Sequence, residues 1–179
     1  PIIIGFISSN LETTELLLRD IQTLFRGYLT DYRIVVCDNS NNTAKLEGLL
    51  RKYSDYYVLF KKKTIDHDCD NGLFGSYFID SDNRRGIAFG RTILHRHVHD
   101  EMRKKPGSVA WIIDDDVRLE TLQPDGASKK ITIEDLNQAI LSLKKRGVAI
   151  ANGMITGDPP IPVLGTIRTQ LLDLSYNQE

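Results

Sequence analysis

The chain has little that would place it outside the class of ordinary folded domains. It holds two cysteines, one tryptophan and six prolines in 179 residues, and its formal net charge is −1. That near-neutral balance gives no electrostatic case for a nucleic-acid or anionic-membrane partner. No apolar run approaches the length of a membrane span, and the first residues lack the pattern of a secretory leader. We therefore expect an intracellular, cytoplasmic protein.

The two cysteines give no indication of a cysteine metal site or of a disulfide bridge. Cys37 and Cys69 do not have the spacing of a metal site, and Cys37 lies inside an apolar run. Both are expected to be reduced thiols rather than a disulfide bridge. A chain of this length suits one α/β domain with a substantial core.

Short apolar runs alternate with helical patterns in the first two thirds of the chain. Strands are predicted over residues 2–7, 33–40, 56–60 and 110–113. Helices are predicted over residues 11–26, 41–52 and 84–105. Strand, helix, strand is the order of a βαβ unit. The sequence therefore predicts an α/β protein, a Rossmann-like three-layer α/β/α domain with a mostly parallel central sheet.

Other segments give weaker or mixed patterns. Lys61–Lys63 close the third strand, and residues 64–83 show no periodicity, so no element is predicted there. The turn signal Pro124-Asp125-Gly126 leaves a hairpin and a flexible excursion as alternatives for residues 119–130.

The last third begins with a helix signal. Thr132 and Asp135 nearly match a capping box, and the helix is expected to end at Gly147. Its expected buried face consists of Leu136, Ile140, Leu141 and Leu143. A fifth strand is predicted over residues 148–155 and a final helix over residues 164–174.

Three consecutive carboxylates, Asp114, Asp115 and Asp116, follow the strand predicted at residues 110–113, which is expected to be buried because its apolar run is unbroken. Adjacent like charges repel, so this acid triplet needs a cation or hydrogen-bond donors among its members. Because alternate side chains of an extended segment share a face, Asp114 and Asp116 should point one way and Asp115 the other. The second predicted strand also ends in an acid, Asp38. In a parallel sheet both strand ends lie on one edge, where α/β sheets bind ligands.

The third predicted helix begins with arginines and glycines and continues with histidines. Residues 85–91 read Arg-Gly-Ile-Ala-Phe-Gly-Arg, a composition suited to approaching a phosphate or stacking on a base. Further along, His95 and His99 share a helix face while His97 points elsewhere. Only the outer pair could chelate one ion, and no third ligand has suitable spacing. Surface or partly packed histidines are therefore expected.

In the order of these motifs, residues 2–153 resemble the nucleotide-sugar-binding half of a GT-A glycosyltransferase of the family 2-like group. The resemblance rests on Ser8-Ser9-Asn10 after the first strand, on Asp38, on the Arg/Gly helix and on Asp114–Asp116, which is similar to the family's DXD element. It implies a single GT-A-like domain over residues 1–179. Residues 1–118 would bind the nucleotide sugar, and residues 119–179 would begin the acceptor side.

The implied activity is that of a hexosyltransferase-type enzyme, with a nucleoside-diphosphate sugar, UDP-sugar as first choice, as donor and an unknown hydroxyl as acceptor. By the same likeness, Ser8 and Asn10 would line the base pocket, and Asp38 would accept a hydrogen bond from the base. Arg85 or Arg91 would approach the nucleotide.

The resemblance places the metal at the acid triplet. Asp114 or Asp115 would bind the ribose, and Asp116, with Asp114 beside it, would bind Mn²⁺ or Mg²⁺. The family's general base follows the DXD element, and Asp158 is the acid in that direction, as a base or an acceptor contact. The alternative is that sequence beyond Glu179 supplies the acceptor half.

Two other functions stay open. A haloacid-dehalogenase-like phosphatase also has a hydrophobic strand that feeds an Asp-x-Asp pair, although normally on the first strand and with Thr or Val where Arg118 stands here. A nucleotide-sugar-binding or interaction module without turnover would use the acids only to hold a cation, because no base is visible.

Overall fold

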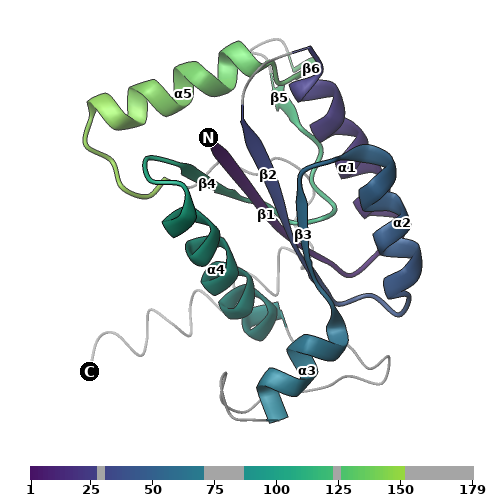
Figure 1. The fold of residues 1–179 in the computed structure, drawn as a ribbon. Helices are drawn as coiled ribbons and strands as arrows, with labels where there is room; N and C mark the ends of the chain where they lie inside the picture. Colours follow the sequence, from purple (N-terminus) through teal and green to yellow (C-terminus); the bar gives the residue numbers. More distant parts are fainter. Residues whose placement is uncertain (28–30, 71–86, 123–125, 152–179) are drawn as a thin grey trace, which may run out of the picture. The chain divides into compact units, whose positions relative to one another are not determined.

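A parallel four-stranded sheet forms the centre of the fold in the computed structural model, which describes residues 1–27, 31–70, 87–122 and 126–151 (Figure 1). The spatial order is β3-β2-β1-β4. The strands are β1 (Ile2–Ser8), β2 (Tyr32–Asp38), β3 (Tyr57–Phe60) and β4 (Val109–Ile112). All four lie within one or two residues of the predicted segments. The α/β class with a parallel sheet flanked by helices is confirmed.

The register of β1 fixes the edge at which the strands end. β1 pairs in parallel with β2 from Ile2 opposite Tyr32 to Ser8 opposite Asp38. On its other side it pairs in parallel with β4. The chain steps outward from β1 to β3 and then returns to the far side of β1, so the direction of winding reverses between β1 and β4. Such a reversal is the usual place for a ligand crevice at the carboxyl edge of an open α/β sheet.

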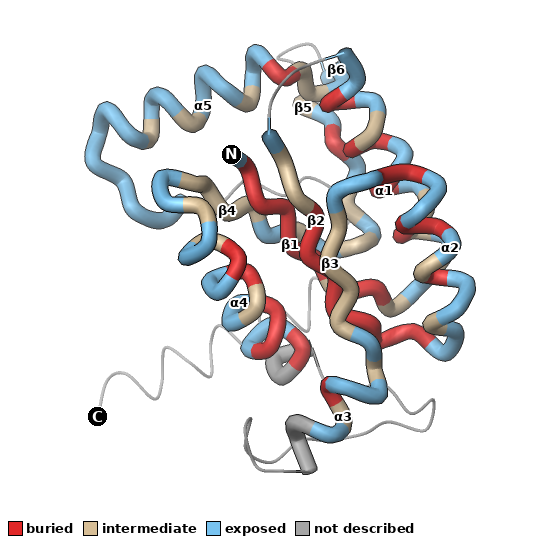
Figure 2. Tube along the Cα trace, in the orientation of Figure 1, coloured by how far each residue is buried: buried red, intermediate tan, exposed pale blue. Residues whose placement is uncertain are grey.

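Helices cover both faces of this sheet, as Figures 1 and 2 show. The helices α1 (Leu11–Phe25) and α2 (Thr43–Tyr53) lie on one face. On the other lie α3 (Lys62–Asp70) and α4 (Ile87–Lys104). Among the described residues, no helix has the length and apolar character needed to cross a membrane.

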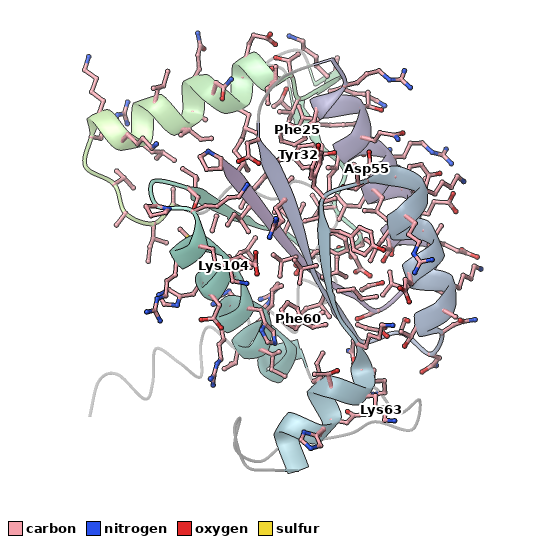
Figure 3. All side chains as sticks on the ribbon, viewed as in Figure 1. Phe25, Tyr32, Asp55, Phe60, Lys63 and Lys104 are labelled. Carbon is pink, nitrogen blue, oxygen red and sulfur yellow. The ribbon has the colours of Figure 1, made fainter. Side chains whose placement is uncertain are left out.

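Alternating residues of β1 divide the core between the two faces. Ile4 and Phe6 are fully buried among residues of α1 and α2, whereas Ile3 is buried against α4. Where α1 leads into β2, the rings of Phe25 and Tyr32 stack with their centroids 4.3 Å apart (Figure 3). The core therefore consists of two apolar clusters, one on each face of the sheet.

A hairpin and a capped helix follow the sheet. Strands β5 (Glu120–Leu122) and β6 (Ser128–Lys130) pair antiparallel, which settles the alternatives for this region in favour of a hairpin. Helix α5 (Ile133–Lys145) begins with the expected reciprocal bonds. The backbone N–H and Oγ1 of Thr132 donate to Asp135 Oδ2 at 3.0 and 2.8 Å, and the Asp135 N–H donates to Thr132 Oγ1 at 3.2 Å. The capping box is confirmed.

Two predictions about secondary structure were wrong within the described residues. The segment expected to lack structure after β3 begins with α3, a helix with many charged residues whose buried anchor is Ile65, so its sequence shows little apolar periodicity. Residues 148–151 of the predicted fifth strand form no strand, and Ile150 is 86% exposed. Residues 152–155 and the predicted helix at 164–174 lie outside the described residues.

Two burial predictions also need correction. Strand β4 was expected to be buried, but it is only half-buried because it has one neighbour, β1, in the described sheet. Leu141 was placed on the buried face of α5, yet it is 66% exposed, whereas Leu136 and Ile140 pack against the core. In both cases the apolar pattern of the sequence predicted the strand or helix correctly but overestimated how far its residues are buried.

Gly5 lies where α4 packs closely on the sheet, and this close packing generates a stability test. A Cβ on Gly5 would lie 2.6 Å from Val98 Cγ2 and 3.4 Å from Leu94 Cδ1. Gly5→Ala should therefore lower the free energy of unfolding by about 1–3 kcal/mol through overpacking. The control is Gly48→Ala on α2, where a Cβ meets nothing within 4 Å. It should raise stability by about 0.5–1 kcal/mol. Urea unfolding measures both, and a neutral Gly5→Ala would contradict the close packing.

Candidate functional site

The carboxyl edge of the sheet gathers the acids that the sequence analysis singled out. Asp38 ends β2 opposite Ser8 of β1. The acid triplet follows β4 after Ile113, whose N–H donates to Gly5 O at 3.0 Å. With β1 between them, β2 and β4 are two strand spacings apart, roughly 10 Å. Asp38 and the triplet therefore belong to one edge of the sheet, beside the point where the winding reverses.

Asp115 turns inward and binds the loop between β1 and α1. Its Oδ2 accepts hydrogen bonds from the backbone N–H of Ser9 at 2.8 Å, the N–H of Asn10 at 3.1 Å and Thr14 Oγ1 at 3.2 Å. Thr14 is fully buried, and its hydroxyl also bonds Ser8 Oγ at 2.8 Å. Asp115 thus joins the turn after β4 to the end of β1 and the first turn of α1.

Asp114 and Asp116 face the solvent, so exposure alternates along the triplet as expected. Both carboxylate oxygens of Asp114 accept from Arg91 Nη2, at 3.0 and 2.9 Å. Both side chains of this ion pair are about half exposed. An exposed pair of this kind contributes at most about 1 kcal/mol, so it can be exchanged for another partner. Asp116 makes no hydrogen bond or ion pair with the part of the chain that the structure describes.

Asp38 is buried and shapes the loop that follows β2. Its Oδ1 accepts from the Ser40 N–H at 2.9 Å and from Ser40 Oγ at 2.7 Å, and its Oδ2 accepts from Thr43 Oγ1. A carboxylate has about four acceptor positions, so one position on Oδ2 is left without a donor from the described residues. Asp38 therefore has a structural role and keeps a limited capacity for one further donor.

A small hollow lies beside Asp38. It is lined by Ile7, Cys37, Asp38, Asn39, Ile65, Gly90 and Ile93. Its volume is only about 10 Å³, room for about one water molecule, and Gly90 lets α4 approach β1 here, since a Cβ on it would lie 2.9 Å from Ile7 Cδ1. Burial, with the charge of Asp38 adding to it, raises the pKa of the Cys37 thiol to about 12. Cys37 is therefore protonated near neutral pH and has no thiolate to act as a nucleophile or metal ligand.

The histidines of α4 take no part in this arrangement. The ring of His97 stacks on that of Phe60 with centroids 3.4 Å apart, while His95 and His99 are exposed. This agrees with surface or partly packed histidines. Across the described ranges, no group of three or more His, Cys, Asp or Glu side chains is placed to hold a metal ion by itself.

An ion pair between exposed Arg118 and buried Asp20, which the sequence analysis missed, holds the segment that follows the triplet. Arg118 donates from Nε and Nη2 to the two carboxylate oxygens of Asp20, at 2.7 and 2.8 Å, and the Asp20 side chain is 5% exposed. The turn that presents Asp114 and Asp116 is thus held on α1 at both ends. Thr14 and Asp20 stand on the leucine-rich face of α1, and polar residues on a buried face require partners, a signal that could have revealed both.

Two predicted site residues, Arg85 and Asp158, lie outside the described residues. Comparison of the chain with protein-family models, curated proteins and solved structures finds no match. Any functional conclusion therefore rests on the chemistry of the residues at this edge.

The contacts of the triplet predict different stability costs for two of its members. Asp115→Ala removes the acceptor for two backbone N–H groups and one buried hydroxyl, so the free energy of unfolding should fall by about 1–3 kcal/mol. Asp116→Ala removes an exposed side chain and should change it by less than about 0.5 kcal/mol. Urea unfolding at pH 7 gives both values. Similar losses in the two variants would show that Asp115 is not the member on which the fold depends.

Proposed function

We propose that the protein binds a nucleoside-diphosphate sugar together with Mn²⁺ or Mg²⁺ at this carboxyl edge and transfers the sugar to an acceptor hydroxyl. The observation that supports this most is the orientation of the three side chains of the triplet. Asp115 is turned into the fold, while Asp114 and Asp116 face outward. They do so beside the reversal of winding, on the same edge as Asp38.

The loop after β1 favours a cation-assisted mode of diphosphate binding. In dinucleotide-binding domains the pyrophosphate lies on backbone N–H groups at the start of the first helix, after a glycine-rich turn. Here the turn is Ser8-Ser9-Asn10, and the N–H groups of Ser9 and Asn10 already donate to Asp115. The Asp115 carboxylate would also repel a phosphate at this position. A diphosphate near the triplet therefore needs another source of positive charge.

The donor set at the edge fits a hard divalent cation. Mg²⁺ is typically bound through one or two protein carboxylates, with substrate phosphates and water completing its coordination. Exposed Asp116, with Asp114 as a second oxygen ligand, matches that requirement without a full protein cage. Such a cation supplies charge stabilisation for the departing nucleoside diphosphate.

Arg91 is the second positive group at the edge. Its guanidinium pairs with Asp114 in a half-exposed ion pair and can turn to a phosphate oxygen at small cost. That exchange would leave the Asp114 oxygens for the cation or a ribose hydroxyl. In this way Arg91 can neutralise Asp114 in the free protein and contact the diphosphate in the complex.

The base would lie on the β2 side of the same edge. Asp38 keeps one acceptor position beyond its bonds to the described residues, which suits a base that presents an N–H donor. Asp158, which the family resemblance suggests as general base, would remove the proton from the attacking hydroxyl.

Metal-dependent nucleotide binding is the first test. UDP should raise the melting temperature by several degrees with Mn²⁺ or Mg²⁺ and much less without, because binding to the native state stabilises it. Asp116→Ala should lose this metal-dependent shift. His95→Ala, which changes an exposed residue on α4, should keep it. No shift in the wild type with any nucleoside diphosphate and metal would reject the proposal, and equal loss in both variants would move the metal to α4.

Turnover separates the proposed transferase from its alternatives. With Mn²⁺ the protein should release UDP from a UDP-sugar, faster when a suitable acceptor is present, and Asp116→Ala should reduce this rate by at least about 100-fold, as expected for loss of charge stabilisation. Nucleotide-sugar binding with no release of UDP would favour a binding module. Release of phosphate from an aryl phosphate, lost in Asp114→Asn, would favour a phosphatase.

A further inference from the structure

The hydrogen bonds of Asp115 connect two parts of the carboxyl edge. The proposed function places the base at one part, beside Asp38, and the cation at the other, beside Asp114 and Asp116. Ser8 stands opposite Asp38 in the sheet, and the Asn39 N–H donates to Ser8 O at 2.9 Å. Ser8 Oγ bonds Thr14 Oγ1, and Thr14 Oγ1 donates to Asp115. A continuous chain of hydrogen bonds therefore runs from the β2 end, across β1, to the turn after β4.

We propose that Asp115 is a positioning residue that couples nucleotide binding to metal binding, rather than a ligand of either. This inference rests on the proposed function of the edge. Asp115 lies between Asp114 and Asp116 in the chain, so the bonds that hold its carboxylate also fix the backbone from which both outward acids project. The same bonds fix the β1–α1 loop beside the base side.

The chemistry of the Asp115 contacts suits this task. Its partners are the backbone N–H groups of Ser9 and Asn10 and the hydroxyl of buried Thr14. Hydrogen bonds to an ionised carboxylate are stronger and shorter than those to a neutral amide oxygen. Asp115→Asn keeps the shape of the side chain but removes the charge, and it should leave the fold intact while loosening the turn relative to the loop.

Coupling has a signature that a purely structural role does not have. If Asp115 fixes the turn after β4 relative to the β1–α1 loop, a bound cation strengthens nucleotide binding only while the Asp115 carboxylate is present. Loss of stability alone would weaken binding with and without metal to the same extent. The ratio of the UDP dissociation constants without and with Mn²⁺ is therefore the quantity to measure.

The experiment is calorimetric titration of UDP into the full chain, with and without saturating Mn²⁺, for the wild type and for Asp115→Asn. In Asp115→Asn the Mn²⁺-dependent gain in affinity should fall about tenfold, while UDP binding without metal changes less than about threefold. Thr14→Val removes one donor to Asp115 and should lose part of the gain. Thr23→Val is the matched control, since Thr23 lies on the same helix and its hydroxyl donates only to Arg19 O, at 2.8 Å.

Hydrogen exchange of the Ser9 and Asn10 amides, measured without ligand, provides a second readout. Exchange should be faster in Asp115→Asn than in the wild type and unchanged in Thr23→Val. Full retention of the Mn²⁺-dependent gain in Asp115→Asn would overturn the coupling role and leave the proposed function standing. Unchanged exchange in Asp115→Asn would overturn the coupling role as well. A wild type whose UDP affinity does not respond to Mn²⁺ would overturn the proposed function and the coupling together.

Discussion

The parallel pairing of β1 with β2 on one side and β4 on the other brings Ser8, Asp38 and the acid triplet to one edge of the sheet. Because both pairings are parallel, the ends of three strands meet at one edge, and Asp38, Ser8 and the acid triplet come together there. The alternation of β1 supplies both cores, with Phe6 facing α1 and α2 and Ile3 facing α4. A shift of one residue in β1 would exchange these faces and move the whole edge.

Three adjacent carboxylates at this edge are tolerated because each has a different environment. Asp115 is neutralised by backbone and hydroxyl donors at the start of α1, where a negative charge also interacts favourably with the helix dipole. Asp114 is neutralised by Arg91, and Asp116 projects toward solvent. The arrangement leaves one acid uncommitted and one held by an exchangeable partner. These are the features that a substrate-bound divalent cation requires.

Much of this could be predicted from the sequence, because the relevant signals are local. The runs at Ile2–Ile7 and Arg33–Asp38 identify buried strands, and the pairing of Thr132 with Asp135 identifies a helix start. The exposure of Asp114 and Asp116 on either side of half-buried Asp115 agrees with the expected alternation, although Asp115 and Asp116 lie in a turn rather than in an extended strand. The partners of Asp115 could not be predicted, because Ser9 and Asn10 lie more than one hundred residues earlier in the chain. Such contacts depend on the strand order, which no local pattern contains.

The wrong predictions have the same origin. Helix α3 has one described buried anchor, Ile65, so hydrophobic periodicity could not reveal it. The expected burial of β4 presumed a neighbour on each side, and the described sheet gives it only β1. The Asp20–Arg118 pair joins α1 to a segment almost one hundred residues away. Depth of burial and long-range ion pairs follow from topology rather than from composition.

The location of a bound cation tests the central claim most directly. Mn²⁺ is paramagnetic and broadens the NMR signals of nearby backbone amides, so a titration of Mn²⁺ with UDP maps its site without a change of sequence. Broadening should centre on Asp114–Val117 and extend to Ser8–Asn10 and Asp38–Ser40, the ends of three adjacent strands. Broadening centred on His95 and His99, or none at the carboxyl edge, would contradict a metal and nucleotide site at this place.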